Sequence, residues 1–142
     1  MIGLVAHDAR KAELMRWVRA HRLALQYETV VATAATARGL REEVGLPAAA
    51  VRAVASGPVG GDQQIGALIA QGELAGLVFF WDPLWAAPHA SDVFALLRLA
   101  TLHNVPTAVN LASAEAIVAA GLDRLRRVRG AGPPLHRVPG GG

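Results

Sequence analysis

Short apolar runs alternate with longer amphipathic stretches along this chain. The apolar runs, typical of strands buried on both faces, lie at 2–6, 29–32, 51–54, 77–81 and 107–109. The amphipathic stretches repeat their apolar residues at helical spacing and lie at 10–23, 36–43, 63–71, 93–102 and 114–120. This order predicts an α/β fold in which a single domain has a parallel β-sheet with helices on both faces.

The composition fits one globular domain followed by a different C-terminal segment. The chain has 142 residues, of which 53% are hydrophobic and 18% are charged. Its end, GAGPPLHRVPGGG, is so rich in glycine and proline that it predicts a flexible tail. We therefore expect a domain over residues 1–127 and a tail over residues 128–142.

Several classes of protein are disfavoured by what the sequence lacks. There is no cysteine, which rules out disulfides, iron–sulfur clusters, thiolate zinc sites and cysteine nucleophiles. No run of about 20 apolar residues predicts a membrane span, and the first residues lack the pattern of a secretion signal. The net charge of +3 reflects an arginine cluster at 124–129, and aromatic residues make up only 5%, so nucleic acid is not an expected partner. A cytoplasmic enzyme or a binding module is the expectation that remains.

Polar residues gather where the predicted strands end. In open parallel sheets, ligands bind beyond the carboxyl ends of the strands. Four of the five aspartates and two of the five histidines fall at this edge. The residues concerned follow the five strands in order: His7 and Asp8; 33–36; 56–62; Asp82, His89 and Asp92; and Asn110.

The segment SGPVGGDQQIGA (56–67) predicts a glycine-rich turn that opens a helix. Small residues let backbone N–H groups approach an anion, and the start of a helix adds positive partial charge. The segment matches neither the Walker loop nor the dinucleotide fingerprint. The alternative is that Asp62 is only the N-cap of a helix that begins at Gln63.

Two further segments carry candidate chemistry. The first segment, FFWDPLWAAPHASDV (79–93), places Asp82, His89 and Asp92 in one loop, where they could donate protons to a substrate or accept them from it. The alternative is that Asp92 caps a helix beginning at residue 93 and that His89 is a surface residue. VAHDARK (5–11) places Lys11 one turn into a helix, where it could hold a phosphate; alternatively, Asp8 is a cap and Lys11 is solvated. A metal site is a poor prediction, since no tight ligand spacing occurs around the histidines and carboxylates of these segments.

Taken together, the segments of this chain resemble methylglyoxal synthase. The resemblance covers about residues 2–120 and rests on VAHDARK, VATAAT, SGPVGGDQQIGA, FFWDPLWAAPHASDV, LLRLAT and NVPTAVN, in this order and spacing. It implies a doubly wound parallel sheet in a three-layer sandwich of the Rossmann or flavodoxin type. It implies conversion of dihydroxyacetone phosphate to methylglyoxal and inorganic phosphate without a metal or organic cofactor, inhibition by phosphate, and a homohexamer.

The resemblance also implies roles for individual residues. Asp62 matches the catalytic base, His89 the histidine at the substrate oxygens, and Asp92 the carboxylate beside it. Asp8 and His7 match a pair in the substrate site. The residues that match the phosphate-binding set are Lys11, Thr33, Thr36, Ser56 and Gly57.

Two departures from the family pattern bear on these expectations. The family's second loop reads TGTTG, whereas residues 33–37 here read TAATA, with two glycines and one hydroxyl lost. A family arginine near the C-terminus that reaches the phosphate region has no clear counterpart; Arg129 and Arg137 are candidates, and neither is chosen.

The competing interpretation is a non-catalytic or impaired module of the same fold that senses a phosphorylated ligand. The segment 79–85 contains more large apolar side chains than one small core needs, namely Phe79, Phe80, Trp81, Leu84 and Trp85. Either some of them face a partner subunit, or all of them pack around one buried strand.

Overall fold

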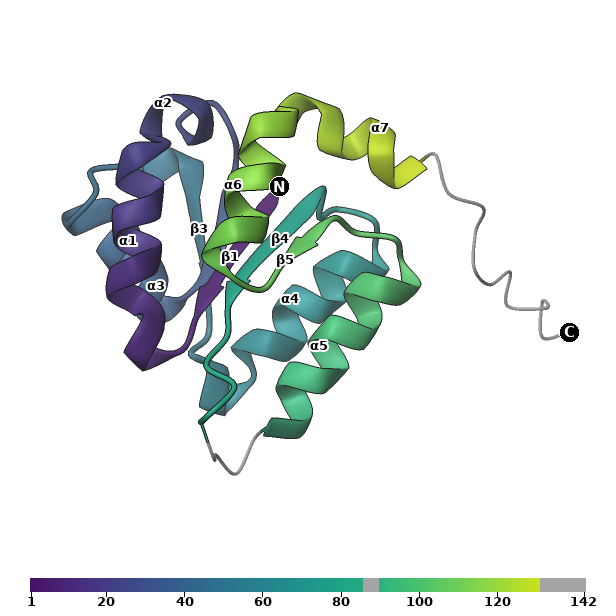
Figure 1. Cartoon of the computed structure of the whole chain (residues 1–142). Coiled ribbons are helices and arrows are strands. Elements are labelled where there is room, and N and C mark those ends of the chain that lie inside the picture. Colours follow the sequence, from purple (N-terminus) through teal and green to yellow (C-terminus); the bar gives the residue numbers. More distant parts are fainter. Residues whose placement is uncertain (86–89, 131–142) are drawn as a thin grey trace, which may run out of the picture.

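The computed structural model describes residues 1–85 and 90–130, and it contains a five-stranded parallel sheet. The strand order is β3-β2-β1-β4-β5, with β1 at the centre (Figure 1). Hydrogen-bonded pairing runs from Ile2 opposite Val30 on one side of β1 and from Ile2 opposite Gly76 on the other. The strands are β1 (Ile2–Ala6), β2 (Val30–Thr33), β3 (Val51–Val54), β4 (Gly76–Phe80) and β5 (Thr107–Ala108).

The helices alternate with these strands, as the periodicity predicts. They are α1 (Lys11–Ala20), α2 (Arg22–Leu25), α3 (Ala34–Glu42), α4 (Gly61–Ala70), α5 (Ala90–Leu102), α6 (Leu111–Ala120) and α7 (Leu125–Gly130). Short 3-10 turns η1 (Asp8–Arg10), η2 (Ala48–Ala50), η3 (Gly57–Val59) and η4 (Leu122–Arg124) join several of them. The predicted α/β class, with a parallel sheet between two helical layers, is confirmed.

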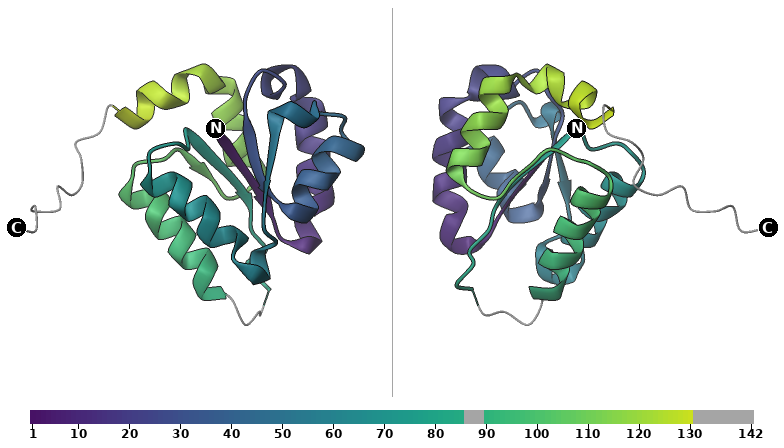
Figure 2. Two further views of the ribbon diagram at one scale, coloured as in Figure 1. Left: turned by 180° about the vertical axis from the view of Figure 1, so that it is seen from behind. Right: turned by 45° about the vertical axis from the view of Figure 1, so that its right-hand side comes forward.

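Two helical layers cover the two faces of the sheet. Figures 1 and 2 show α1, α3 and α6 on one face and α4 with α5 side by side on the other. The chain moves outward from β1 to β2 and β3, and then crosses back to β4 and β5. Because crossovers between parallel strands are right-handed, this change of direction moves the connecting helix to the other face. The sheet is therefore doubly wound, and its switch point lies between β1 and β4.

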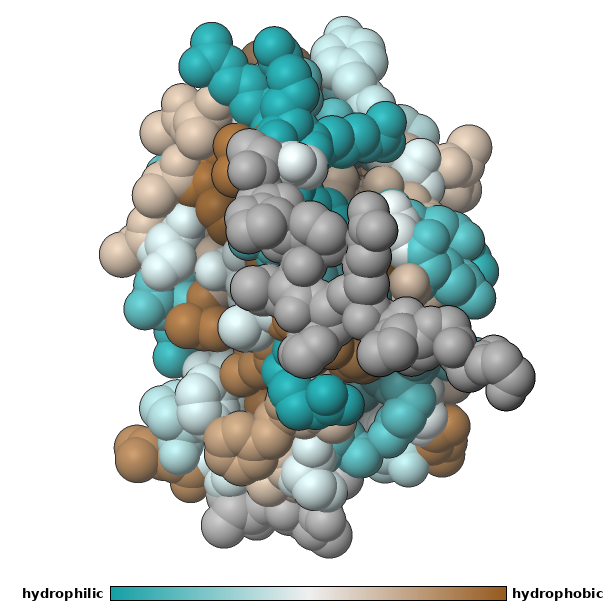
Figure 3. Space-filling model, turned by 90° about the vertical axis from the view of Figure 1, so that its right-hand side faces the viewer, coloured by the Kyte–Doolittle hydropathy of each residue, from teal (hydrophilic) through white to brown (hydrophobic). Residues whose placement is uncertain are grey.

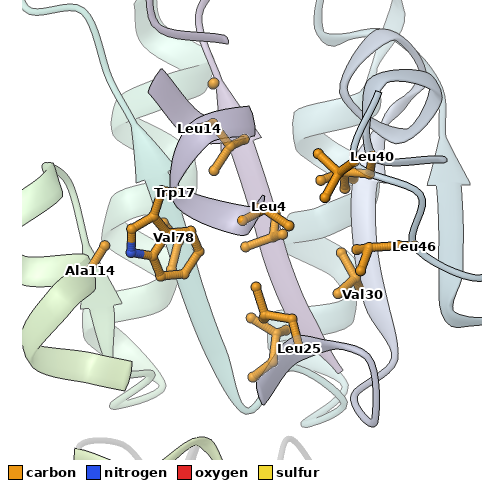
Figure 4. Close-up of a cluster of buried hydrophobic side chains, with 14 of the residues drawn as sticks. Leu4, Leu14, Trp17, Leu25, Val30, Leu40, Leu46, Val78 and Ala114 are labelled. Carbon is orange, nitrogen blue, oxygen red and sulfur yellow. The ribbon is translucent and has the colours of Figure 1, made fainter. Parts of the chain in front are cut away.

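Each face of the sheet has its own apolar core, because side chains alternate along a strand. On β1, Leu4 points into the cluster with α1 and α3, and its neighbour Val5 points into the cluster with α4 and α5. Figure 4 shows the first cluster, in which Trp17 of α1 packs between Val78 of β4 and Ala114 of α6. Burial on both faces explains why the strands read as continuous apolar runs.

Four helices begin two or three residues earlier than the apolar periodicity predicts, and two of them, α5 and α6, start at residues 90 and 111 rather than 93 and 114. α3 starts at residue 34 and α4 at residue 61, whereas the apolar pattern starts at 36 and 63. The first turns of both helices face the carboxyl edge of the sheet, so their residues are small or polar and carry no apolar signal. The helix α7 was not predicted, and the expected boundary between residues 127 and 128 falls inside it. The tail predicted beyond α7, including Arg137, lies outside the described residues.

Arg129 anchors α7 at the amino-terminal edge of the sheet. Its Nη1 donates to the carbonyl oxygens of Gly72 and Leu74, each at 2.8 Å. Its own carbonyl accepts from Nδ2 of Asn104 at 3.0 Å. These contacts hold the Arg129 guanidinium away from the carboxyl ends of the strands within this chain.

Candidate active site

A pocket of about 280 Å³ opens at the carboxyl ends of β1, β2 and β3, beside the switch point of the sheet. This is where a doubly wound sheet binds its ligands. Its described lining consists of Val5, Ala6, His7, Asp8, Lys11, Thr33, Ala35, Ser56, Gly57, Pro58, Asp62, Phe79 and Trp85. Seven of the predicted site residues are therefore brought to one hollow, from segments that are far apart in the sequence: His7, Asp8, Lys11, Thr33, Ser56, Gly57 and Asp62.

Asp62 is held in the pocket by the turn that precedes α4. Gly60 has φ of 106°, which side chains rarely allow, and a Cβ on Gly61 would lie 2.0 Å from the carbonyl oxygen of Ala55. Both positions therefore require glycine. The side chain of Asp62 is only 7% exposed. Its Oδ2 would lie 3.5 Å from a Cβ on Gly57, so the carboxylate sits close to the glycine backbone of the turn.

The structure rejects the alternative in which Asp62 is an N-cap. The N-cap of α4 is Gly60, and Asp62 is the second residue of the helix. A carboxylate in the first turn of a helix is stabilised by the positive end of the helix dipole. The burial of Asp62 therefore has to be explained by its surroundings in the pocket rather than by capping.

Two helical N-termini point their backbone at the same pocket. Thr33 is the N-cap of α3 and Ser56 is the N-cap of η3; both have extended backbone, and within the described residues no side chain caps either turn. The first N–H groups of α3 have no partner within the helix, so they can bind an anion. In η3 only Gly57 offers such a group, because Pro58 has no N–H and that of Val59 donates to the carbonyl of Ser56 at 3.1 Å. This end of the pocket is suited to a phosphate group.

The alanines of the second loop fit without backbone strain. Outside glycine, Asn104 alone has a positive φ in the described part of the chain, so Ala34, Ala35 and Ala37 have ordinary backbone angles. The loss of the two family glycines therefore costs no strain. Ala35 lines the pocket with a methyl group where the family pattern has a hydroxyl.

Thr36 lies deeper than the sequence suggested. Its side chain is fully buried, and Oγ1 of Thr33 donates to Oγ1 of Thr36 at 3.4 Å. Among the residues that the structure describes around the pocket, Thr33 lines the wall and Thr36 stands behind it. The hydroxyl of Thr36 thus supports Thr33, and a direct contact between Thr36 and a ligand would come from its backbone N–H.

Lys11 and Asp8 form an ion pair at the rim of the pocket. Nζ of Lys11 donates to Oδ1 of Asp8 at 2.5 Å, and the hydrogen bond and charge of Lys11 lower the pKa of the Asp8 carboxyl. The Asp8 side chain is 95% exposed, whereas that of Lys11 is 31% exposed. Asp8 is the first residue of η1 and not its cap, and Lys11 is not simply solvated, so neither alternative from the sequence holds.

The imidazole of His7 is restrained by a hydrogen bond and by two aromatic rings among the described residues. Its Nδ1 accepts a hydrogen bond from the backbone N–H of Asp82 at 3.0 Å. Its ring also contacts the rings of Phe79 and Trp85. No role in the site was predicted for Phe79 or Trp85, although both belong to the segment 79–93 that was singled out for its acids and histidine.

Asp92 lies near Asp62 but outside this pocket. It is in the first turn of α5, which begins at Ala90, so it does not cap a helix starting at residue 93. Asp92 lines an adjacent apolar groove of about 280 Å³ between α4 and α5, and Asp62 lines that groove as well as the pocket. Asp62 is therefore shared by the pocket and by the groove that Asp92 lines. His89, the predicted histidine at the substrate oxygens, lies outside the described residues.

Two further properties bear on the kind of site. In residues 1–85 and 90–130, no three histidine or carboxylate side chains come together closely enough to hold a metal ion. Over the same residues, no helix is both long enough and apolar enough to cross a membrane.

Fold and pocket together define an α/β protein with a site for a small anionic molecule beside a buried carboxylate. The sequence matches the family model of the MGS-like domain over residues 13–109. A methylglyoxal synthase of Aliivibrio fischeri (strain MJ11) is 53% identical over 119 residues, which are 84% of this chain and 77% of the relative. The chain belongs to the methylglyoxal synthase family, and its expected enzyme class, a lyase, is confirmed.

Other relatives agree with this membership. A methylglyoxal synthase of Erwinia tasmaniensis is 51% identical over 82% of this chain and 75% of the relative. A crystal structure of methylglyoxal synthase from Elizabethkingia anophelis NUHP1 has a TM-score of 0.77 and 44% identity, covering 83% of this chain and 76% of that chain. The predicted fold is therefore found in a solved member of the family.

Proposed function

We propose that the protein converts dihydroxyacetone phosphate to methylglyoxal and inorganic phosphate. The observation that carries this proposal is the burial of Asp62 in the pocket that Thr33, Ser56 and Lys11 also line. A buried carboxylate beside an anion-binding surface is suited to remove a proton from a substrate whose phosphate is held a short distance away. The similar proteins described above are methylglyoxal synthases, which supports the same reaction.

In the first step, Asp62 takes a proton from the hydroxymethyl carbon. The electron pair of that C–H bond moves toward the neighbouring carbonyl, and an enediolate forms. Hydrogen-bond donors stabilise the negative charge on its oxygen, because they bind this charge more strongly in the transition state than in the ketone. His89 is the donor that the family resemblance implies, and His7 is a further imidazole at the pocket wall.

In the second step, the enediolate expels phosphate from the carbon on the other side of the carbonyl. The C–O bond breaks and its electron pair leaves with the phosphate, while the hydroxyl group of the first carbon becomes the aldehyde and gives its proton to the phosphate. The remaining enolate takes up a proton at its terminal carbon, which becomes the methyl group of methylglyoxal. The two products account for every atom of the substrate. Expulsion needs the C–O bond to stand roughly perpendicular to the enediolate plane, where its antibonding orbital overlaps the π system.

The phosphate end of the pocket would set that torsion. The backbone N–H groups at the start of α3 and the N–H of Gly57 would bind phosphate oxygens, and Lys11 would add a positive charge at the rim. An isomerase acting on the same substrate has to hold the phosphate near the enediolate plane to prevent its loss. The way the pocket binds the phosphate group therefore determines the product as well as the affinity for the substrate. Free phosphate should bind at the same place and compete with the substrate.

Asp92 would act on the site from the α4–α5 groove. Its position at the first turn of α5 places it directly after the segment that contains His89. A carboxylate there can orient an imidazole or stabilise its protonated form. Asp8 would act mainly by holding Lys11, since the two form an ion pair.

We further propose a cytoplasmic homo-oligomer, a hexamer by resemblance to the family. Phe79 and Phe80 are fully buried in this chain's own core, which accounts for two of the surplus aromatic residues. Leu84 is 91% exposed and Phe94 is 59% exposed, so apolar surface remains for a partner subunit. On the face in Figure 3, brown apolar side chains are scattered among polar ones. Light scattering of the purified protein gives the subunit number, and a monomer at all concentrations would contradict the proposal.

The reaction is tested by incubating the purified protein with dihydroxyacetone phosphate and measuring both products. We expect methylglyoxal and phosphate in equal amounts. The Asp62→Asn variant should lose nearly all turnover and still bind inorganic phosphate in calorimetry. Asp123→Asn is the matched control, because it makes the same change at a side chain that is 75% exposed and outside the pocket lining. Phosphate binding by the wild type without turnover would instead support the ligand-sensing module.

A further inference from the structure

The imidazole of His7 is enclosed by three groups from β4 and the segment after it. The backbone N–H of Asp82 donates to Nδ1 at 3.0 Å. The ring of Phe79 meets it edge to face, with centroids 5.2 Å apart and planes at 82°. The ring of Trp85 lies over it in a tilted stack, with centroids 4.3 Å apart and planes at 38°. His7, Phe79 and Trp85 all line the pocket.

The hydrogen bond from Asp82 determines which ring nitrogen of His7 carries a proton. An amide N–H can donate only to a nitrogen with a lone pair, so Nδ1 is unprotonated while this bond exists. The proton of the neutral imidazole is then on Nε2, and the fully protonated ring would lose the bond. While this bond is made, Nε2–H is therefore the donor that His7 offers.

One tight turn provides both this N–H group and the indole ring. Asp82 and Pro83 begin the turn, and aspartate followed by proline is typical of its first two positions. Oδ1 of Asp82 accepts from the N–H of Leu84 at 3.0 Å, and the N–H of Trp85 donates to the carbonyl of Asp82 at 3.3 Å. The turn brings Trp85 back over His7, so the tautomer and the orientation of the imidazole are fixed by the same four residues.

We propose that Trp85 is a positioning residue that acts through His7. Its ring and the edge of Phe79 confine the imidazole plane, while Asp82 selects the tautomer, so that Nε2–H is directed at the substrate oxygens in the pocket. This rests on the proposed function, since the oxygens are those of the phosphorylated ketone. An aromatic ring at position 85 would thereby raise kcat more than it raises substrate affinity, because a directed donor is worth most to the charge that develops during reaction.

The experiment compares Trp85→Leu, which keeps an apolar side chain but loses the plane, with Trp85→Phe, which keeps a plane. Tyr27→Leu is the matched control, since it makes the same change from an aromatic ring to leucine at a residue that is 86% exposed and outside the described pocket lining. We expect Trp85→Leu to lower kcat by about tenfold with KM within about twofold, and Trp85→Phe to restore most of kcat. Tyr27→Leu should behave as wild type. Equal losses in the two Trp85 variants, or none in either, would overturn the proposal.

A second measurement needs no turnover, and its decisive spectrum is that of the wild type. Nitrogen-15 spectra distinguish protonated from unprotonated imidazole nitrogens, and His7→Asn identifies the His7 signals among those of the five histidines. At a pH above the imidazole titration, we expect the wild type to show a single tautomer, with Nε2 protonated, and Trp85→Leu to show a mixture. An Nδ1–H tautomer or a mixture in the wild type would overturn the proposal. If the wild type releases no product from dihydroxyacetone phosphate, the proposed function fails, while these spectra still decide the role of Trp85.

Discussion

Gly61 packs against the backbone of Ala55 and Ser56 and directly precedes the proposed base Asp62, so a change at Gly61 should affect both stability and activity. A Cβ at this position would lie 2.0 Å from the carbonyl oxygen of Ala55, 2.9 Å from its carbonyl carbon and 3.0 Å from the carbonyl carbon of Ser56. Ordinary carbon–oxygen contacts need more than 3 Å, so Gly61→Ala has to move backbone by about 1 Å or more. All three atoms are backbone, so no rotation of a side chain can relieve the clash.

The displaced turn would carry Asp62 with it, because Asp62 is the next residue. A misplacement of about 1 Å in a reacting group costs about 100-fold in rate. We therefore expect Gly61→Ala to lower kcat/KM by about 100-fold and to reduce the free energy of unfolding by about 1–3 kcal/mol through overpacking. Initial rates with dihydroxyacetone phosphate and urea unfolding measure the two effects.

Gly66→Ala is the matched control on the same helix. A Cβ there would meet only Cδ1 of Leu99 at 3.0 Å, which is the end of a flexible side chain. The helix should accept this alanine with kcat/KM within about threefold of the wild type, and alanine favours helix over glycine by about 1 kcal/mol. The reasoning is refuted if Gly61→Ala is as active and as stable as Gly66→Ala.

Three further predictions concern the pocket wall, its rim and the opposite edge of the sheet. Ala35→Thr should lower both KM and the inhibition constant of phosphate by about tenfold, since a buried charge-assisted hydrogen bond is gained; unchanged constants would show that the hydroxyl is not used. Lys11→Met should raise the pKa of the Asp8 carboxyl, which the hydrogen bond from Lys11 lowers; an NMR titration that shows no upward movement contradicts this. Arg129→Leu should lower the free energy of unfolding by about 1–2 kcal/mol with kcat unchanged, because its bonds to two carbonyls lie far from the pocket; equal urea midpoints would count against the anchoring role.

The architecture could be predicted because hydrophobic periodicity reports burial directly. β1, for example, is apolar at every position and is covered on both faces. Hydrophobic periodicity did not predict the first turns of α3 and α4, since these turns face the pocket rather than the core. The helix α7 escaped it too, because its attachment depends on Arg129 and backbone carbonyls rather than on an apolar stripe.

The candidate site was predictable as a location but not in its details. In a parallel sheet, ligands bind beyond the carboxyl ends of the strands, and this rule predicts that His7, Thr33 and Asp62 lie at one edge. The pocket lining contains all three. The rule could not tell that Thr36 points behind the wall or that Asp92 faces the neighbouring groove, since both depend on helix rotation by a fraction of a turn. It also could not find Trp85, whose place depends on the geometry of one turn.

The most direct test of Asp62 as the base follows the proton itself. Dihydroxyacetone phosphate is labelled with deuterium at the hydroxymethyl carbon, and the appearance of the label in water is measured alongside phosphate release for the wild type and Asp62→Asn. We predict a primary isotope effect and label release with the wild type, and neither label release nor phosphate release with Asp62→Asn. Label release by Asp62→Asn at the wild-type rate would contradict the central claim, because another group would then be removing the proton.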